Sequence, residues 1–190
     1  LLLLFPALML INHYQRRDTA KDWQKADAWG IRLAILMLWI FGIRVRTRGT
    51  PVDGPVLIAA NHISWLDILA LHTRVAMGFV AKAEIEQWPV FGYIARTGGT
   101  IFHLRGSHDS AADVTSVMVK RLRLGRRVAI FPEGGIVPGV EVRVFHARMF
   151  RAAVDVGCPV QPVMVRYLRN GHRDDEILFQ KNESMLANFI

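Results

Sequence analysis

The sequence predicts one α/β domain with a mixed, partly parallel sheet flanked by helices, preceded by an N-terminal membrane-associated helical hairpin. Short apolar segments bounded by Gly or Pro alternate with longer helical patterns, as in layered α/β folds. The chain has 190 residues, enough for one such domain with a proper core. We expect the hairpin over residues 1–48 and the α/β domain over residues 49–190, truncated at its C-terminus because no closing element follows.

Two apolar stretches, Leu1–Ile11 and Leu33–Ile43, predict the hairpin. Each covers about 11 residues, whereas a spanning helix needs roughly 20, so an interfacial or re-entrant arrangement fits better. The segment between them is polar and basic, and Trp23, Trp29 and Trp39 suit the headgroup zone. These features favour docking into one leaflet of a membrane from its cytoplasmic face. The alternative is that both stretches are buried core helices.

The first half of the α/β domain follows from local patterns. Residues 43–48 alternate apolar and basic side chains, which predicts an edge strand, and a Gly-bounded turn covers residues 49–54. The apolar run Val56–Ala60 predicts a buried strand, and Ser64 is expected to cap a helix reaching about His72. Further strands are predicted at residues 78–81 and 101–104.

The second half continues the alternation. Residues 109–124 predict a helix that ends at Gly125 and carries basic side chains in its last turn, where they complement the helix dipole. Residues 128–131 predict a buried strand ended by Pro132. Residues 145–156 predict a helix ended by Gly157, and residues 159–165 predict a final strand. This order gives a sheet with helical crossovers.

The chain is strongly basic, with a net charge of +8. This charge points to an anionic partner, such as anionic lipid, a phosphorylated substrate or an acidic carrier protein. We expect no nucleic-acid partner, because the basic residues do not alternate with aromatics and no recognised binding motif appears. One cysteine, Cys158, excludes an intrachain disulfide and a Cys-rich zinc site, and it is interpreted as a buried small apolar residue. The spacing of the other histidines predicts no metal site: His103, His108, His146 and His172.

His62 and Asp67 are the candidate catalytic pair, in the segment Asn61-His62-Ile63-Ser64-Trp65-Leu66-Asp67 after a predicted buried strand. A carboxylate that holds one ring N–H fixes the tautomer and leaves the other nitrogen free to take a proton from a hydroxyl. Taken alone, Ser64-x-x-Asp67 also fits a capping box, in which Asp67 would only support the start of the helix. Asn61 is expected to satisfy local backbone groups.

Three other blocks accompany this pair at predicted strand ends or loops: residues 97–106 (TGGTIFHLRG), 131–135 (FPEGG) and 158–163 (CPVQPV). In this order and spacing, over about residues 55–165, the blocks resemble the glycerolipid acyltransferase family, of which 1-acylglycerol-3-phosphate acyltransferases are the standard bacterial members. The N-terminal apolar segments are similar to the membrane-docking helices of that family. The combination of NHxSxxD with FPEG is specific, whereas His-x4-Asp alone is weak.

The resemblance implies transfer of a fatty acyl group from a thioester, acyl-CoA or acyl carrier protein, to the free hydroxyl of a lysophospholipid in phospholipid biosynthesis. Lysophosphatidic acid, converted to phosphatidic acid, is the expected acceptor. His62 would act as the base with Asp67 orienting it, without a covalent intermediate and without a cofactor. Expected acceptor-binding residues are Arg105, Glu133, Gly134 and Lys82. Alternatives are another acceptor, such as a lyso-ornithine lipid, or a membrane-peripheral binding module that has lost catalysis.

The sequence departs from the family pattern in the third block and after it. FPEGG replaces the common FPEGT, so Gly135 brings no hydroxyl, and residues 136–144 lack the usual Ser/Arg-rich continuation. Leu104 occupies a position where an acid often precedes the arginine. These differences leave His62 in place and bear on the identity of the acceptor.

Overall fold

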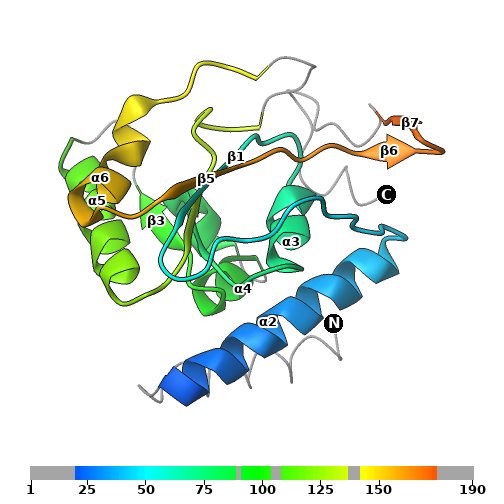
Figure 1. Ribbon diagram of the computed structural model, residues 1–190, viewed down its shortest axis with the longest axis horizontal. Coiled ribbons are helices and arrows are strands. Elements are labelled where there is room, and N and C mark those ends of the chain that lie inside the picture. The colour runs from blue at the N-terminus through cyan, green and yellow to red at the C-terminus, as the bar shows by residue number, and fades with distance from the viewer. Residues whose placement is uncertain (1–19, 89–90, 104–107, 137–141, 175–190) are drawn as a thin grey trace.

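A five-stranded parallel sheet forms the centre of the molecule (Figure 1). The computed structural model describes residues 20–88, 91–103, 108–136 and 142–174. The strand order is β3-β2-β4-β1-β5, and every pairing in this sheet is parallel. The strands are β1 Leu57–Ala60, β2 Gly78–Lys82, β3 Ile101–His103, β4 Val128–Ile130 and β5 Val160–Val163. The prediction of a mixed sheet was therefore wrong. Antiparallel pairing is seen in the separate ribbon of β6 Leu168–Arg169 and β7 His172–Arg173.

Helices cover both faces of the sheet. They are α2 Ala20–Ile40, α3 Leu66–His72, α4 Phe91–Thr97, α5 His108–Arg123 and α6 Arg151–Val156, with 3-10 turns at Ala83–Gln87 and Ala147–Phe150. Helices α5 and α6 pack together on one face, and α3 packs on the other. Helix α2 lies outside α3 and α4 as an additional layer (Figure 1).

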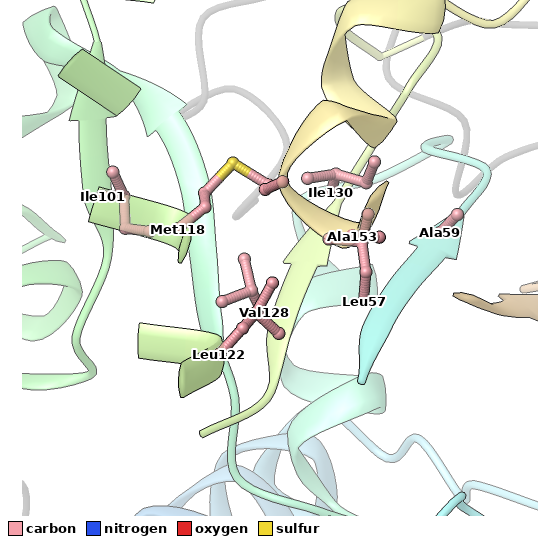
Figure 2. Close-up of a cluster of buried hydrophobic side chains, with 9 residues drawn as sticks. Leu57, Ala59, Ile101, Met118, Leu122, Val128, Ile130 and Ala153 are labelled. Carbon is pink, nitrogen blue, oxygen red and sulfur yellow. The ribbon is translucent and has the colours of Figure 1, made fainter. Parts of the chain in front are cut away.

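Alternating strand residues build a core on each face. Leu57, Val128 and Ile130 face α5 and α6, where Met118 and Leu122 close the cluster that Figure 2 shows. The intervening residues of the same strands face α3 on the other side of the sheet. Burial of one such leucine, isoleucine or valine contributes about 1.5–3 kcal/mol. Both faces being apolar explains why these strands appear in the sequence as continuous apolar runs.

Residues 43–48 form no strand, so the predicted edge strand was wrong. The edge positions of the sheet belong to β3 and β5, and β5 pairs directly with β1. Residues 44–50 are exposed. An alternating pattern indicates a two-sided segment, but it carries no information on whether a neighbouring strand is free to pair with it.

Helix α2 is continuous from Ala20, so it includes part of the segment predicted to link two apolar helices. One side is buried against the domain through Leu33, Ala34 and Leu38, while Trp39 and Ile40 are exposed. The earlier stretch Leu1–Ile11 lies outside the described residues. Among the helices of residues 20–174 that the structure describes, none is long and apolar enough to cross a bilayer.

Candidate active site

His62 and Asp67 meet at the carboxyl end of β1. Strand β1 ends at Ala60, and α3 begins at Leu66. Asp67 therefore lies in the first turn of the helix that follows β1. The His62 Nδ1 and Asp67 Oδ2 atoms are 2.9 Å apart. The Asp67 side chain is fully buried, and that of His62 is 12% exposed. The structure therefore brings together the two residues predicted from the motif.

The Asp67 carboxylate is held by further donors besides the imidazole. Oδ2 accepts hydrogen bonds from the backbone N–H groups of Ile63 at 2.8 Å and Ser64 at 3.0 Å, while Oδ1 accepts one from Tyr167 at 2.7 Å. The bond from Ser64 is the carboxylate half of a capping box. The same oxygen therefore supports the helix start and faces His62, so the capping contact and the His62–Asp67 contact are compatible.

Ser64 does not cap the helix as predicted. The N-cap residue of α3 is Trp65, which makes no side-chain capping bond. The Ser64 hydroxyl instead accepts a long hydrogen bond of 3.4 Å from the Leu66 N–H. Capping of this helix start depends on the buried Asp67 carboxylate rather than on the serine.

The His62 ring is fixed from a second direction by Phe131, which follows β4. Their ring centroids are 3.8 Å apart and the planes differ by 12°. Because Asp67 presents an oxygen that only accepts, we assign the proton to Nδ1, which leaves Nε2 with its lone pair. Within the described residues no hydrogen bond reaches Nε2. The imidazole is oriented, partly exposed and able to accept a proton.

Glu133 ties the carboxyl end of β4 to that of β1. Its Oε1 accepts a hydrogen bond from the His62 backbone N–H at 3.1 Å, and its Oε2 accepts one from the Arg143 N–H at 2.9 Å. The side chain is 7% exposed, so it is not a surface acid. Both of its oxygens accept from backbone N–H groups, and the expected contact of Glu133 with the acceptor stays a prediction.

The remaining predicted binding residues differ in how the structure describes them. Gly134 has a left-handed φ of +79°, beside the His146 ring. Lys82 is exposed at the carboxyl end of β2, the strand next to β4. Arg105 lies outside the described residues, and the strand before it, β3, ends at His103. The carboxyl ends of β2, β4 and β1 lie along one edge of the parallel sheet, where α/β folds bind ligands.

Two residues of the site have long-range roles that local patterns did not reveal. Tyr167 contacts Asp67 across 100 positions of sequence, and no motif links them. Asn61 does not satisfy local groups as expected. Its amide donates to the Val165 carbonyl at 3.0 Å and accepts from the Val165 N–H at 2.7 Å.

Cys158, which is free, lies away from this pair. Cys158 precedes the first residue of β5, whereas the pair lies after the last residue of β1. It is half-buried rather than fully buried as predicted, and burial raises the pKa of its thiol. Within the described part of the chain, no cluster of three or more His, Cys, Asp or Glu residues is arranged to hold a metal ion.

A family model described as Acyltransferase matches residues 42–166, well over half of the chain. The chain belongs to the acyltransferase family. The match spans every strand of the central sheet together with both residues of the His62–Asp67 pair. It confirms the resemblance recognised from the four sequence blocks.

Two curated relatives of this acyltransferase-family chain carry different acceptor names. The lyso-ornithine lipid O-acyltransferase of Pseudomonas aeruginosa is 34% identical over 168 residues, which cover 85% of this chain and 65% of that protein. The 1-acyl-sn-glycerol-3-phosphate acyltransferase of Neisseria gonorrhoeae is 38% identical over 112 residues, covering 59% of this chain and 44% of that protein. The chain thus spans less than two thirds of the length of either relative.

A solved structure supports the fold. The crystal structure of the 1-acyl-sn-glycerophosphate (LPA) acyltransferase PlsC from Thermotoga maritima aligns with a TM-score of 0.59 and 24% identity, covering 84% of this chain and 71% of that one. The acyltransferase-family chain therefore shares its layered α/β architecture with that protein.

Proposed function

We propose that this protein transfers a fatty acyl group from a thioester donor, acyl-CoA or acyl carrier protein, to the free hydroxyl of a lysolipid. Lysophosphatidic acid is the leading acceptor. The observation that carries the proposal is the 2.9 Å contact between His62 Nδ1 and the buried Asp67 carboxylate, with Nε2 left unpaired by the described residues. Family membership supports the reaction class.

In the proposed reaction, His62 Nε2 takes the proton of the acceptor hydroxyl as its oxygen attacks the thioester carbonyl carbon. A new C–O bond forms, and the tetrahedral intermediate then expels the thiolate as the C–S bond breaks. The imidazolium returns its proton to the thiolate sulfur. Asp67 stabilises the imidazolium and keeps its tautomer. Since a thiol has a pKa near 8.5, the thiolate leaves readily and no acyl-enzyme intermediate is required.

The direct test measures thiol release from acyl-CoA with lysophosphatidic acid in detergent micelles. His62→Ala should lower kcat by about 10²–10⁴, the usual contribution of a positioned base. Asp67→Asn should also lower kcat, because an amide N–H₂ facing Nδ1 favours the wrong tautomer. His172→Ala is the control, because His172 is exposed in β7. Full activity of His62→Ala would exclude this mechanism.

A lyso-ornithine lipid is the second candidate acceptor. It is favoured by the Pseudomonas aeruginosa relative, whose match extends over more of this chain than that of the Neisseria gonorrhoeae protein. Parallel assays with lysophosphatidic acid and a lyso-ornithine lipid separate the two, and the acceptor with the larger kcat/KM identifies the substrate class.

Lys82 and Arg105 are proposed to contact an anionic acceptor. Lys82 ends β2, and Arg105 follows in the sequence the neighbouring strand β3, which ends at His103. Lys82→Ala and Arg105→Ala should each raise KM for a phosphorylated acceptor more than they lower kcat. Lys120→Ala, on the exposed surface of α5, is the matched control. Equal KM values for all three variants would remove Lys82 and Arg105 from the acceptor site.

We also propose that the protein works on the cytoplasmic face of the bacterial inner membrane. The support is an exposed apolar group on α2, of which Trp39 is 73% and Ile40 is 62% exposed, flanked by Arg32 and Arg44. Replacing Trp39 and Ile40 together by serine should reduce co-sedimentation with anionic vesicles. Val154→Ser changes an equally exposed apolar residue on α6 and should have no effect.

A further inference from the structure

We propose that Tyr167 is a positioning residue for the base, which acts by holding the Asp67 carboxylate in the orientation that faces His62. This inference rests on the proposed acyltransferase function. The Tyr167 hydroxyl donates a hydrogen bond of 2.7 Å to Asp67 Oδ1, while Oδ2 receives His62 Nδ1. The phenol and the imidazole thus contact opposite oxygens of one carboxylate.

The two oxygens of Asp67 are in different situations. Oδ2 has three donors, His62 and the backbone N–H groups of Ile63 and Ser64. The hydrogen bond that the structure gives to Oδ1 comes from Tyr167. Because Asp67 is 0% exposed, water does not replace a lost donor without rearrangement. A buried carboxylate oxygen without a donor is costly, so the phenol adds to the three donors on Oδ2 in holding this rotamer.

Tyr167 is itself held firmly enough for this role. Tyr167 is 8% exposed and packs with Leu38 of α2 and with Trp65 and Leu66 at the start of α3. Its backbone carbonyl accepts a hydrogen bond of 3.0 Å from the Asp174 N–H. The Asn61 side chain binds both the N–H and the carbonyl of Val165, which lies two positions before Tyr167 in the sequence. The phenol therefore approaches Asp67 from a segment fixed to both β1 and the helical layer.

The protonation state of Tyr167 suits a permanent donor. Burial, together with the adjacent Asp67 charge and hydrogen bond, raises the pKa of the phenol far above its usual value of 10.0. A neutral phenol also disperses part of the carboxylate charge. Removing it makes Asp67 a stronger base, which holds the His62 proton more tightly once the ring is protonated.

Tyr167→Phe removes the hydroxyl and keeps the ring. We expect kcat to fall about tenfold to a hundredfold, the effect of one charge-assisted hydrogen bond, with little change in KM. The acid limb of the pH profile of kcat should move to higher pH by up to about one unit. Tyr93→Phe is the matched control, since Tyr93 is a half-buried tyrosine packed near α2 and away from Asp67. It should match the wild type in both measurements.

A measurement that needs no enzyme turnover tests the role of Tyr167 independently of the proposed acyltransferase function. Histidine-selective NMR, with the His62 signal assigned by its loss in His62→Ala, follows protonation of the ring directly. In Tyr167→Phe the midpoint of the His62 titration should rise, and in Tyr93→Phe it should not. A rise in this midpoint in a protein without acyltransferase activity would support the coupling and reject the function.

Three results would overturn the role of Tyr167. They are an unchanged kcat and pH profile, an unchanged His62 midpoint, or a loss of activity that follows only the folded fraction measured by circular dichroism. If Tyr167→Phe does not fold, 3-fluorotyrosine can be incorporated into a Tyr14→Phe/Tyr93→Phe background, where Tyr167 is the remaining tyrosine. The more acidic phenol donates a stronger hydrogen bond and should lower the midpoint. A constant midpoint there would also reject the role.

Discussion

The Glu133 carboxylate accepts a hydrogen bond from the backbone N–H of His62 at 3.1 Å, across 71 positions of sequence. Its other oxygen accepts from the Arg143 N–H, so one side chain links the ends of β1 and β4 to the segment that follows. Since β1 and β4 are neighbours in the sheet, this link fixes the height of His62 relative to Phe131, on which its ring stacks. Glu133 thus sets the position of the base without touching its ring.

Glu133→Gln tests this arrangement. The amide presents an N–H₂ group where a second oxygen stood, so either His62 N–H or Arg143 N–H loses its acceptor. We expect a loss of about 1–3 kcal/mol in the free energy of unfolding and a fall in kcat of about tenfold. Glu84→Gln, an exposed change in the 3-10 turn Ala83–Gln87, is the control. An increase confined to KM for the acceptor would instead indicate direct contact with the substrate.

Asn61→Asp should weaken the link between β1 and the segment after β5. The Asn61 amide both donates to and accepts from the backbone of Val165, and a carboxylate would place an oxygen against the Val165 carbonyl. The expected cost is about 1–3 kcal/mol in the free energy of unfolding, measured by urea titration, with a parallel fall in kcat. Asn170→Asp, in the exposed turn between β6 and β7, should change neither.

The central strands could be predicted from the sequence because burial on both faces leaves an unbroken apolar run. This reason applies to β1 and β4, whose residues are all buried. Strands β2, β3 and β5 were also predicted, although β3 and β5 are edge strands and β5 is largely exposed. The prediction of an edge strand at residues 43–48 was wrong, because alternating side chains do not show whether a neighbouring strand is available for pairing. Helix α4, Phe91–Thr97, was missed because it is short and contains Gly92.

Some residues of the candidate site could also be identified from the sequence, and others could not. His62, Asp67 and Glu133 were identified because each follows or adjoins an apolar strand within a compact motif. Tyr167 and the contact between Asn61 and Val165 were not, because they depend on which strands are neighbours. That β5 pairs with β1, which brings Val165 and Tyr167 beside Asn61 and Asp67, is a property of the sheet order. No local period in the sequence encodes this order.

His72 makes stability sensitive to mild acid. Its ring packs edge-on against Phe79 with centroids 5.2 Å apart, and its Nδ1 is shut off from solvent without a hydrogen-bond partner in the described structure. Burial lowers the pKa of His72 from 6.5 to about 4. Between pH 6.5 and about 4, the unfolded chain therefore binds a proton at His72 that the folded protein does not bind. The contribution to stability is complete above pH 6.5 and is lost as the pH falls toward 4.

The expected loss between these pH values is on the order of 2 kcal/mol. His72→Phe keeps an aromatic ring against Phe79 and removes the titrating group. Its unfolding free energy should be flatter over this pH range and exceed that of the wild type at low pH. His172→Phe, an exposed change, should retain the wild-type slope. Equal slopes for His72→Phe and the wild type would show that another group is responsible.

Gly134→Ala combines two penalties that can be measured separately. Gly134 has a φ of +79°, and an added Cβ would lie 3.0 Å from His146 Nε2. The left-handed backbone costs an alanine about 1–2 kcal/mol. Gly157→Ala isolates this term, because Gly157 has a φ of +70° and no atom within 4 Å of an added Cβ. Any excess cost of Gly134→Ala over Gly157→Ala therefore comes from contact with His146.

The His146 contact can then be removed. In the His146→Ala background, Gly134→Ala should lower the free energy of unfolding only as much as Gly157→Ala does in the wild type. Activity should respond differently, because Gly134 follows Glu133 directly and its N–H bonds to the Phe131 carbonyl at 3.0 Å. A turn forced open at this point moves Glu133 away from the His62 N–H, so kcat should fall in Gly134→Ala and remain unchanged in Gly157→Ala. If both alanine variants kept full activity while only stability fell, the Glu133 turn would not control the position of His62.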